Sequence, residues 1–196
     1  VYVLRMKQAA VLLQEKLASL LTALAEKIEA TAELPVMAHT HIQPAEPTTL
    51  GYRFAVYAQD LLEDMADLTQ LINKIRGKGY KGAVGTQASY EEILHGTGMS
   101  PADMEHIAMR DLGIDCFPIA TQTYTRQQDI RIINVLSGIA ASLHKFGMDF
   151  RILQSPPFGE WAEPFGKNQV GSSAMPFKRN PINTENICSL ARYISS

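Results

Sequence analysis

Residues 126–154 read RQQDIRIINVLSGIAASLHKFGMDFRILQ, and the spacing of apolar side chains in this stretch decides the fold class. Apolar residues recur at alternating steps of four and three: Ile132, Leu136, Ile139, Leu143, Phe146, Phe150 and Leu153. This period places them along one face of an α-helix. A helix of about thirty residues is ~45 Å long, whereas ~10–14 residues is average. The stretch therefore predicts a long helix that needs packing partners along its length.

Two further stretches, residues 1–33 and 48–76, carry the same kind of apolar stripe. Three long helices predict an all-α fold, an elongated helical bundle. Several apolar residues lie off the main stripes: Leu12, Leu21, Val56, Leu62, Leu71 and Val135. Because unpaired apolar surface favours association, we expect the bundle to continue into other subunits, with a monomeric bundle as the alternative.

The segments between the long helices are richer in helix breakers. Residues 35–47 contain three prolines and are expected to form a connector. Short helices are expected at residues 86–94 and from Pro101 to near Gly113, the second with Ser100 as N-cap and Asp103 in its first turn. Residues 114–125 form either a loop or a short extended piece. After an aperiodic stretch, a last helix is expected to begin near Pro181, with Asn180 as its N-cap.

The composition is that of an ordinary globular protein. The 196 residues carry a formal net charge of −2, which gives no reason to expect binding to nucleic acid or to a membrane surface. The two cysteines, Cys116 and Cys188, are too few for a disulfide framework. No apolar run approaches the ~20 residues of a membrane span, and no signal peptide is visible. We expect a cytoplasmic protein, and both ends of the sequence look cut from something longer.

Two short motifs suggest cofactors only superficially. Residues 77–82, GKGYKG, match the dinucleotide fingerprint GxGxxG, but a long helix precedes them instead of a strand. We interpret them as a helix stop and turn. The pair His39 and His41 lacks further ligands at zinc-site spacing, since Glu33 and Glu46 fit no such set. We expect neither a metal nor another cofactor.

The most polar constellation lies at residues 171–181, GSSAMPFKRNP, which we name the signature loop. Two hydroxyls, an ammonium, a guanidinium and an amide gather there beside a predicted helix N-terminus, an environment that favours anions. The alternative is a polar surface loop with a good helix start. His41 lies in a loop bounded by prolines, and histidine can donate a proton near neutral pH, although a surface histidine is usually inert.

The signature loop resembles that of the fumarase/aspartase superfamily, whose pattern is GSSxMPxKxNP. Its form here is similar to adenylosuccinate lyases and to carboxymuconate cycloisomerases. Residues 40–51, THIQPAEPTTLG, resemble the adenylosuccinate lyase pattern TH-x-QPA-x-PTT-x-G. Residues 81–89 and 121–126 resemble the KGxxGTQAS and GQTYSR segments of the same family. The resemblance covers essentially the whole chain.

The resemblance implies a fold and an assembly. Residues 1–196 would form a single domain, most of the central helical-bundle domain of that superfamily, with the family's N-terminal and C-terminal domains absent from the chain. The family forms homotetramers in which each active site joins segments from three subunits. His41, Gln122 and Ser172 would then meet across chains.

The resemblance also implies a reaction, elimination of fumarate from adenylosuccinate and from the succinyl-carboxamide imidazole ribonucleotide of purine biosynthesis. Ser172 matches the family's base and His41 its acid, which protonates the leaving nitrogen. Lys178 and Asn180 match residues that hold the substrate carboxylates and the aci-carboxylate intermediate. The remaining substrate contacts would be Thr40, Gln122, Ser173 and Met175. Positive charge near a developing carbanion, and a proton for the leaving nitrogen, are what the chemistry requires.

The sequence departs from the family at several points. His39 has no family counterpart and is treated as a bystander. Asn186 stands where some members have an arginine, a difference of subgroup. A second family histidine and further binding residues are missing, so we expect the 196 residues alone to be inactive. The alternatives are another superfamily member, such as a carboxymuconate cycloisomerase or an argininosuccinate lyase-like enzyme, and a catalytically inactive structural relative.

Overall fold

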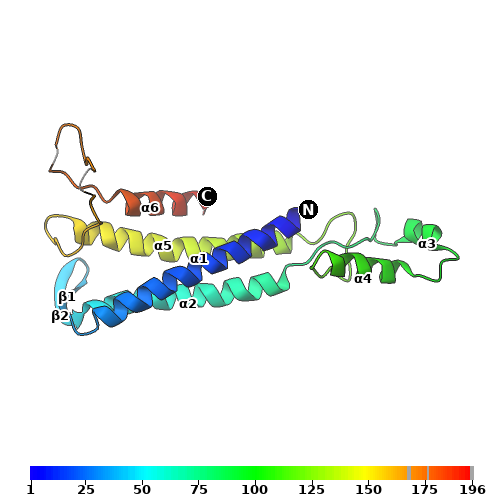
Figure 1. Cartoon of the computed structure of the whole chain (residues 1–196), viewed down its shortest axis with the longest axis horizontal. Coiled ribbons are helices and arrows are strands. Elements are labelled where there is room, and N and C mark those ends of the chain that lie inside the picture. Colours follow the sequence, from blue (N-terminus) through cyan, green and yellow to red (C-terminus); the bar gives the residue numbers. More distant parts are fainter. Residues whose placement is uncertain (167–168, 176, 195–196) are drawn as a thin grey trace. The chain divides into compact units, whose positions relative to one another are not determined.

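The computed structural model describes residues 1–166, 169–175 and 177–194, and this part of the chain is mostly helical, which confirms the predicted class (Figure 1). The elements follow in the order α1 (Tyr2–Ala30), β1 (Pro35–Thr40), β2 (Gln43–Thr49), α2 (Leu50–Lys74), α3 (Ala88–Leu94), α4 (Pro101–Asp111), α5 (Gln127–Gln154) and α6 (Ile182–Ile194). None of the helices in the described ranges is both long enough and apolar enough to cross a membrane.

The chain divides into two compact units. Unit 1 comprises Val1–Leu20 and Met65–Ile133, and unit 2 comprises Leu21–Asp64 and Asn134–Ser196. Each of the three long helices, α1, α2 and α5, contributes residues to both units. The expectation that the chain forms a single domain stays a prediction.

In unit 1, helix α4 begins as its sequence predicts. The Ser100 hydroxyl accepts the Asp103 N–H, and the Asp103 carboxylate accepts the Ser100 N–H, so the two residues form a capping box with Pro101 in the first turn. The Ser100 hydroxyl also donates to the Asp103 carboxylate at 2.6 Å, and this bond, followed by the one from the Ser100 N–H, lowers the pKa of Asp103. The buried core of this unit is apolar and includes Ala10, Leu17, Leu68, Leu71, Ile75 and Met109.

A buried ion pair fixes the glycine-rich turn that follows α2. Lys81 and Glu105 are 7% and 6% exposed, and the Lys81 ammonium binds the Glu105 carboxylate, which also accepts the Tyr80 N–H at 2.6 Å. Burial alone would raise the pKa of Glu105, but the bonds from Lys81 and Tyr80 outweigh it and lower the pKa. The interpretation of residues 77–82 as a helix stop and turn is confirmed, because α2 ends at Lys74 and Gly79 has a φ of 72°.

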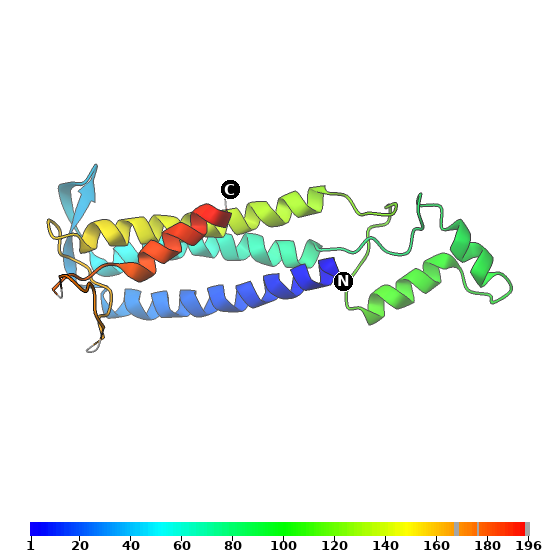
Figure 2. The same cartoon turned by 90° about the horizontal axis from the view of Figure 1, so that it is seen from above.

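In unit 2, α6 packs against α5, and both helices lie side by side in Figure 1 and Figure 2. The contact is close because Gly147 carries no side chain: a Cβ there would lie 2.9 Å from the Cys188 sulfur. Cys188 is fully buried, and its thiol donates to the His144 carbonyl at 3.8 Å. Cys188 is therefore a free, buried thiol.

The proline-containing segment does connect α1 with α2, but it forms an antiparallel hairpin, and its two strands were not predicted. Strands β1 and β2 pair from Pro35↔Thr49 to Thr40↔Gln43, with a register shift between Met37 and His39. Proline is tolerated because it begins one strand at Pro35, and because β2 pairs only with β1 in the described ranges, which leaves its other edge without ladder bonds there.

Candidate functional site

The predicted acid, His41, lies at the tip of the hairpin. His41 and Ile42 are the two residues between β1 and β2, and their φ angles are 53° and 62°. Positive φ at both central residues is the backbone geometry of a type I′ turn. Both Thr40 and His41 are exposed, so the hairpin presents the histidine to its surroundings from the end of a paired scaffold.

The predicted base, Ser172, lies in a tightly folded part of the signature loop. Its hydroxyl oxygen accepts the Met175 N–H at 3.2 Å, and the Met175 carbonyl accepts the Lys178 N–H at 3.0 Å. A Cβ on Gly171 would lie 1.7 Å from the Lys178 carbonyl, so only glycine fits at the first position of the loop. An N–H bond to a serine oxygen favours negative charge on that oxygen. Pro176 lies outside the described residues.

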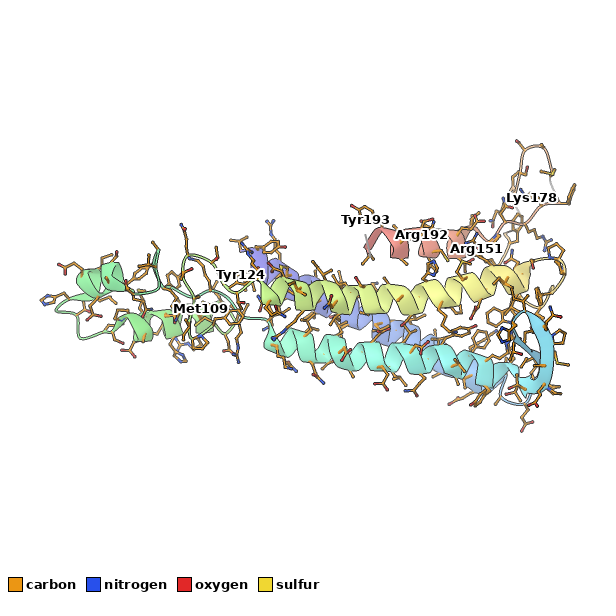
Figure 3. All side chains as sticks on the ribbon, turned by 180° about the vertical axis from the view of Figure 1, so that it is seen from behind. Met109, Tyr124, Arg151, Lys178, Arg192 and Tyr193 are labelled. Carbon is orange, nitrogen blue, oxygen red and sulfur yellow. The ribbon has the colours of Figure 1, made fainter. Side chains whose placement is uncertain are left out.

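The other predicted substrate contacts of the loop are accessible. Ser173, Met175 and Lys178 are exposed, and Figure 3 shows Lys178 on the loop that leads into α6. Asn180 is half-buried. Its predicted role as N-cap was wrong, because the first helical bond runs from Glu185 N–H to the carbonyl of Pro181 at 2.9 Å, which makes Pro181 the N-cap.

A remote carboxylate replaces the predicted cap of α6. Glu163 accepts hydrogen bonds from the backbone N–H groups of Asn183 at 3.1 Å and Thr184 at 2.8 Å, and from both side chains. Burial tends to raise the pKa of Glu163, but the two N–H bonds prevail and lower it. The Gln154 side chain donates to the Arg179 carbonyl at 3.1 Å and accepts the Glu163 N–H at 2.9 Å. Together these bonds close the base of the loop.

The predicted site residues lie on three segments of the described chain: the hairpin, the signature loop and the stretch that contains Gln122. Among the described residues, no hydrogen bond or ion pair connects Thr40 or His41 with the signature loop. Gln122 is exposed and belongs to unit 1, whereas the hairpin and the loop belong to unit 2. Assembly of the site from several subunits therefore stays a prediction.

Sequence reasoning missed a cluster beneath the hairpin. His39, Arg53 and Tyr57 line a cavity of about 270 Å³, together with Ile42 and Asp149. Arg53 pairs with Glu160 at 2.5 Å, and the Nδ1 atom of His39 lies 3.8 Å from the same carboxylate. The side chains of His39 and Arg53 are each only 15% exposed. His39, Arg53 and Glu160 are far apart in the sequence, so no local pattern could have revealed the cluster.

The Tyr57 hydroxyl supplies a second polar contact in this cavity. It donates to Asp149 at 2.9 Å, and the Lys145 ammonium binds the same carboxylate oxygen at 3.2 Å. Burial is the main cause that raises the pKa of Tyr57, and the adjacent Asp149 charge raises it further. Tyr57 therefore stays a neutral donor near neutral pH.

Two curated relatives of this chain are both named adenylosuccinate lyase. Adenylosuccinate lyase from Schistosoma mansoni is 45% identical over 185 residues, which is 93% of this chain and 38% of that protein. Adenylosuccinate lyase from Saccharomyces cerevisiae is 41% identical over 182 residues, 92% of this chain and 37% of that protein. The chain thus spans well under half the length of these relatives.

Comparison with solved structures gives the same fold. The 3-carboxy-cis,cis-muconate lactonizing enzyme from Pseudomonas putida matches 99% of this chain and 42% of its own, with a TM-score of 0.85 and 26% identity. Fumarate lyase from Mesorhizobium sp. BNC1 matches 99% of this chain and 40% of its own, with a TM-score of 0.81 and 26% identity. Residues 1–195 match a protein-family model described as "Lyase". The chain therefore belongs to this lyase family, as the resemblance of its motifs to the fumarase/aspartase superfamily predicted.

Proposed function

We propose that the protein is an adenylosuccinate lyase, which eliminates fumarate from adenylosuccinate to give AMP and from the succinyl-carboxamide imidazole ribonucleotide of purine biosynthesis. The observation that carries the proposal is 45% identity to a curated adenylosuccinate lyase over 93% of the chain. Presence of both the TH-x-QPA motif and the signature loop supports it. In this proposal, residues 1–196 form the central helical domain of the enzyme.

Proton removal is the first half of the proposed reaction. The Ser172 oxygen takes a proton from the carbon beside a substrate carboxylate, and the electron pair left behind forms an aci-carboxylate. A serine is a poor base unless its alkoxide is stabilised. The hydrogen bond from the Met175 N–H to the Ser172 oxygen supports this role, because it stabilises negative charge on that atom.

Expulsion of the nitrogen is the second half. The C–N bond breaks, the double bond of fumarate forms, and His41 gives a proton to the departing nitrogen. Lys178 and Asn180 hold the substrate carboxylates and offset the charge of the intermediate. The substrate contacts completing the site are Thr40, Gln122, Ser173 and Met175.

We also propose that the protein works as a homotetramer in the cytoplasm. Exposed apolar side chains on two long helices support the assembly: Leu12 is 56% exposed, Val56 44% and Leu62 52%. Leu71, which was predicted to lie off the packed face, is only 7% exposed and contributes nothing to this surface. Sedimentation of the complete protein as a monomer would contradict this part of the proposal.

Fumarate release from adenylosuccinate by the protein expressed from its complete gene tests the proposed activity. The parent protein should form fumarate, and Ser172→Ala should lower kcat by about 100-fold or more, since general-base catalysis contributes ~10²–10⁴. Ser19→Ala, on the exposed face of α1, serves as a matched control and should leave kcat unchanged. Absence of fumarate from an intact oligomer would refute the proposal and favour a catalytically inactive relative.

A second candidate is a cycloisomerase of the same superfamily. The TM-score of 0.85 to the 3-carboxy-cis,cis-muconate lactonizing enzyme favours it. Incubation with 3-carboxy-cis,cis-muconate distinguishes the two, because an adenylosuccinate lyase should leave this compound unchanged. Lactone formation without fumarate release from adenylosuccinate would establish the second candidate.

A further inference from the structure

The hairpin tip that carries His41 is strained. Two-residue turns with positive φ at both positions favour Asn-Gly, because glycine and asparagine tolerate this backbone region. Here the second position is Ile42, with a φ of 62°. A β-branched residue at positive φ is a genuine outlier, and such strain costs about 1–3 kcal/mol. The surrounding structure must therefore hold the tip in place.

The segment that follows α5 packs against strand β1. The His39 ring packs edge-on against Phe158, with 5.1 Å between ring centroids and 81° between ring planes. Its Nδ1 atom is buried, makes no hydrogen bond within the described part of the chain, and lies 3.8 Å from Oε1 of Glu160. The carboxylate of Glu160 therefore faces the hairpin two residues from His41.

Glu160 is itself fixed to two helices of unit 2. Its Oε2 atom binds Nη1 of Arg53, in the first turns of α2, at 2.5 Å. Its backbone N–H donates to the Leu153 carbonyl, near the end of α5, at 3.0 Å. Gly159, with a φ of 61°, permits the chain reversal that brings Glu160 back over α5.

The adjacent Trp161 strengthens this attachment. Its ring stacks on Phe54, with 5.2 Å between centroids and 13° between planes, and the guanidinium of Arg53 lies over it at 5.3 Å. Arg53 is thus held by a carboxylate and an aromatic face together, which restricts its rotamer.

We infer that Glu160 is a positioning residue for His41, because it pairs with Arg53 of α2 and faces His39 of β1 at 3.8 Å, and so fixes the direction in which the strained tip presents the histidine. The inference rests on the proposed function, in which His41 is the acid. Three residues further along the same segment, Glu163 caps α6 and anchors the loop that carries Ser172. One short segment, residues 160–163, therefore holds both elements that carry the proposed catalytic groups.

An ion pair of purely structural importance would behave differently. Loss of such a pair lowers the free energy of unfolding but leaves the turnover of the folded fraction unchanged. Loss of a positioning contact lowers kcat with little change in KM, because misplacement of a catalytic group by ~1 Å can cost up to ~100-fold in rate. The division between kcat and KM, measured on folded protein, therefore separates the two roles.

Glu160→Gln in the complete protein tests the inference with adenylosuccinate as substrate. We expect kcat to fall about tenfold and KM to stay within about twofold, with thermal unfolding and oligomeric state monitored in parallel. The matched control is Glu46→Gln, an exposed carboxylate on β2 that makes no ion pair among the described residues. The control should retain the kcat of the parent protein.

Glu160→Asp covers the case in which Glu160→Gln fails to fold. Aspartate keeps the charge but withdraws it by one methylene from Arg53 and His39, so kcat should still fall severalfold. Suppose that the parent protein is active and that the kcat of the folded variant, Glu160→Gln or Glu160→Asp, is unchanged. This result would overturn the inference and leave the proposed function intact. A rise in KM at unchanged kcat would also overturn the inference. A parent protein that releases no fumarate would overturn the proposed function, and the inference with it.

Discussion

Glu163 and Thr184, 21 residues apart, are joined by two hydrogen bonds of 2.8 Å, from the Thr184 N–H and the Thr184 hydroxyl to the same carboxylate oxygen. These bonds hold the negatively charged Glu163 carboxylate at the N-terminus of α6, where the helix dipole stabilises it. The two ends of the segment containing the signature loop are thereby held together, while Ser173, Met175 and Lys178 remain exposed. Because its two ends are fixed and its central side chains are exposed, the signature loop can contact a substrate.

Removal of this remote cap should weaken unit 2. Glu163→Gln retains the size of the side chain but loses the charge, and replaces one acceptor oxygen by a donor that faces N–H groups. We expect the free energy of unfolding to fall by about 1 kcal/mol, the usual contribution of a helix cap. Urea denaturation measures this change. Glu33→Gln, at an exposed carboxylate after α1, should have no comparable effect, and equal losses for both variants would contradict the prediction.

The same carboxylate should make stability depend on acid pH. Folding lowers the pKa of Glu163, so its contribution is fully present above the unfolded value of ~4.3 and is lost as the pH falls through the lower folded pKa. Parent and Glu163→Gln should therefore differ most near pH 6 and converge below the folded pKa. Denaturation curves of both proteins across this range provide the measurement. A difference that persisted unchanged in strong acid would exclude this linkage.

Elements with local determinants could be predicted from the sequence, and those with remote determinants could not. Apolar spacing predicted the long helices to within a few residues, and Ser100, Pro101 and Asp103 predicted the start of α4, because these signals act within one or two turns. Three prolines concealed the hairpin at residues 35–49, since a strand that pairs on one side only tolerates them. The cap of α6 comes from Glu163, far outside any local window.

The candidate site, too, could be predicted from the sequence only in part. Motifs identified Ser172, His41 and Lys178 by resemblance, whereas the supports of these residues depend on tertiary contacts. His39 was treated as a bystander, yet it is half-buried and faces Glu160. No spacing rule connects positions 39, 53 and 160, so only the folded chain reveals that they form a cluster.

Relief of strain at the hairpin tip should stabilise the protein. Asparagine tolerates positive φ far better than a β-branched residue, and Ile42 is 60% exposed, so little apolar burial is lost. Ile42→Asn should raise the free energy of unfolding by about 1 kcal/mol. Ile42→Val keeps the β-branch and should bring no gain. Thermal denaturation of the two variants decides the matter, and a less stable Asn variant would show that the turn is not strained.

Gly51 should tolerate no side chain. It lies where α2 begins against the end of α1, its N–H donates to the Thr31 carbonyl at 2.9 Å, and a Cβ would lie 2.6 Å from the Ile28 carbonyl. Gly51→Ala should therefore cost about 2 kcal/mol, typical of overpacking. Gly166→Ala is the control, because among the described residues its Cβ would meet no atom closer than 3.8 Å. Chemical denaturation should separate the two variants clearly, and equal stability would contradict the tight contact.

The buried pair of Lys81 and Glu105 should be costly to break from one side. Glu105→Gln leaves a buried ammonium without its counter-charge, which costs about 3 kcal/mol or more. The double variant Lys81→Met with Glu105→Gln removes both charges, and the glutamine oxygen can still accept the Tyr80 N–H. The double variant should therefore be more stable than Glu105→Gln alone, as measured by urea denaturation. A double variant less stable than the single one would mean that Lys81 stabilises unit 1 through contacts other than its charge.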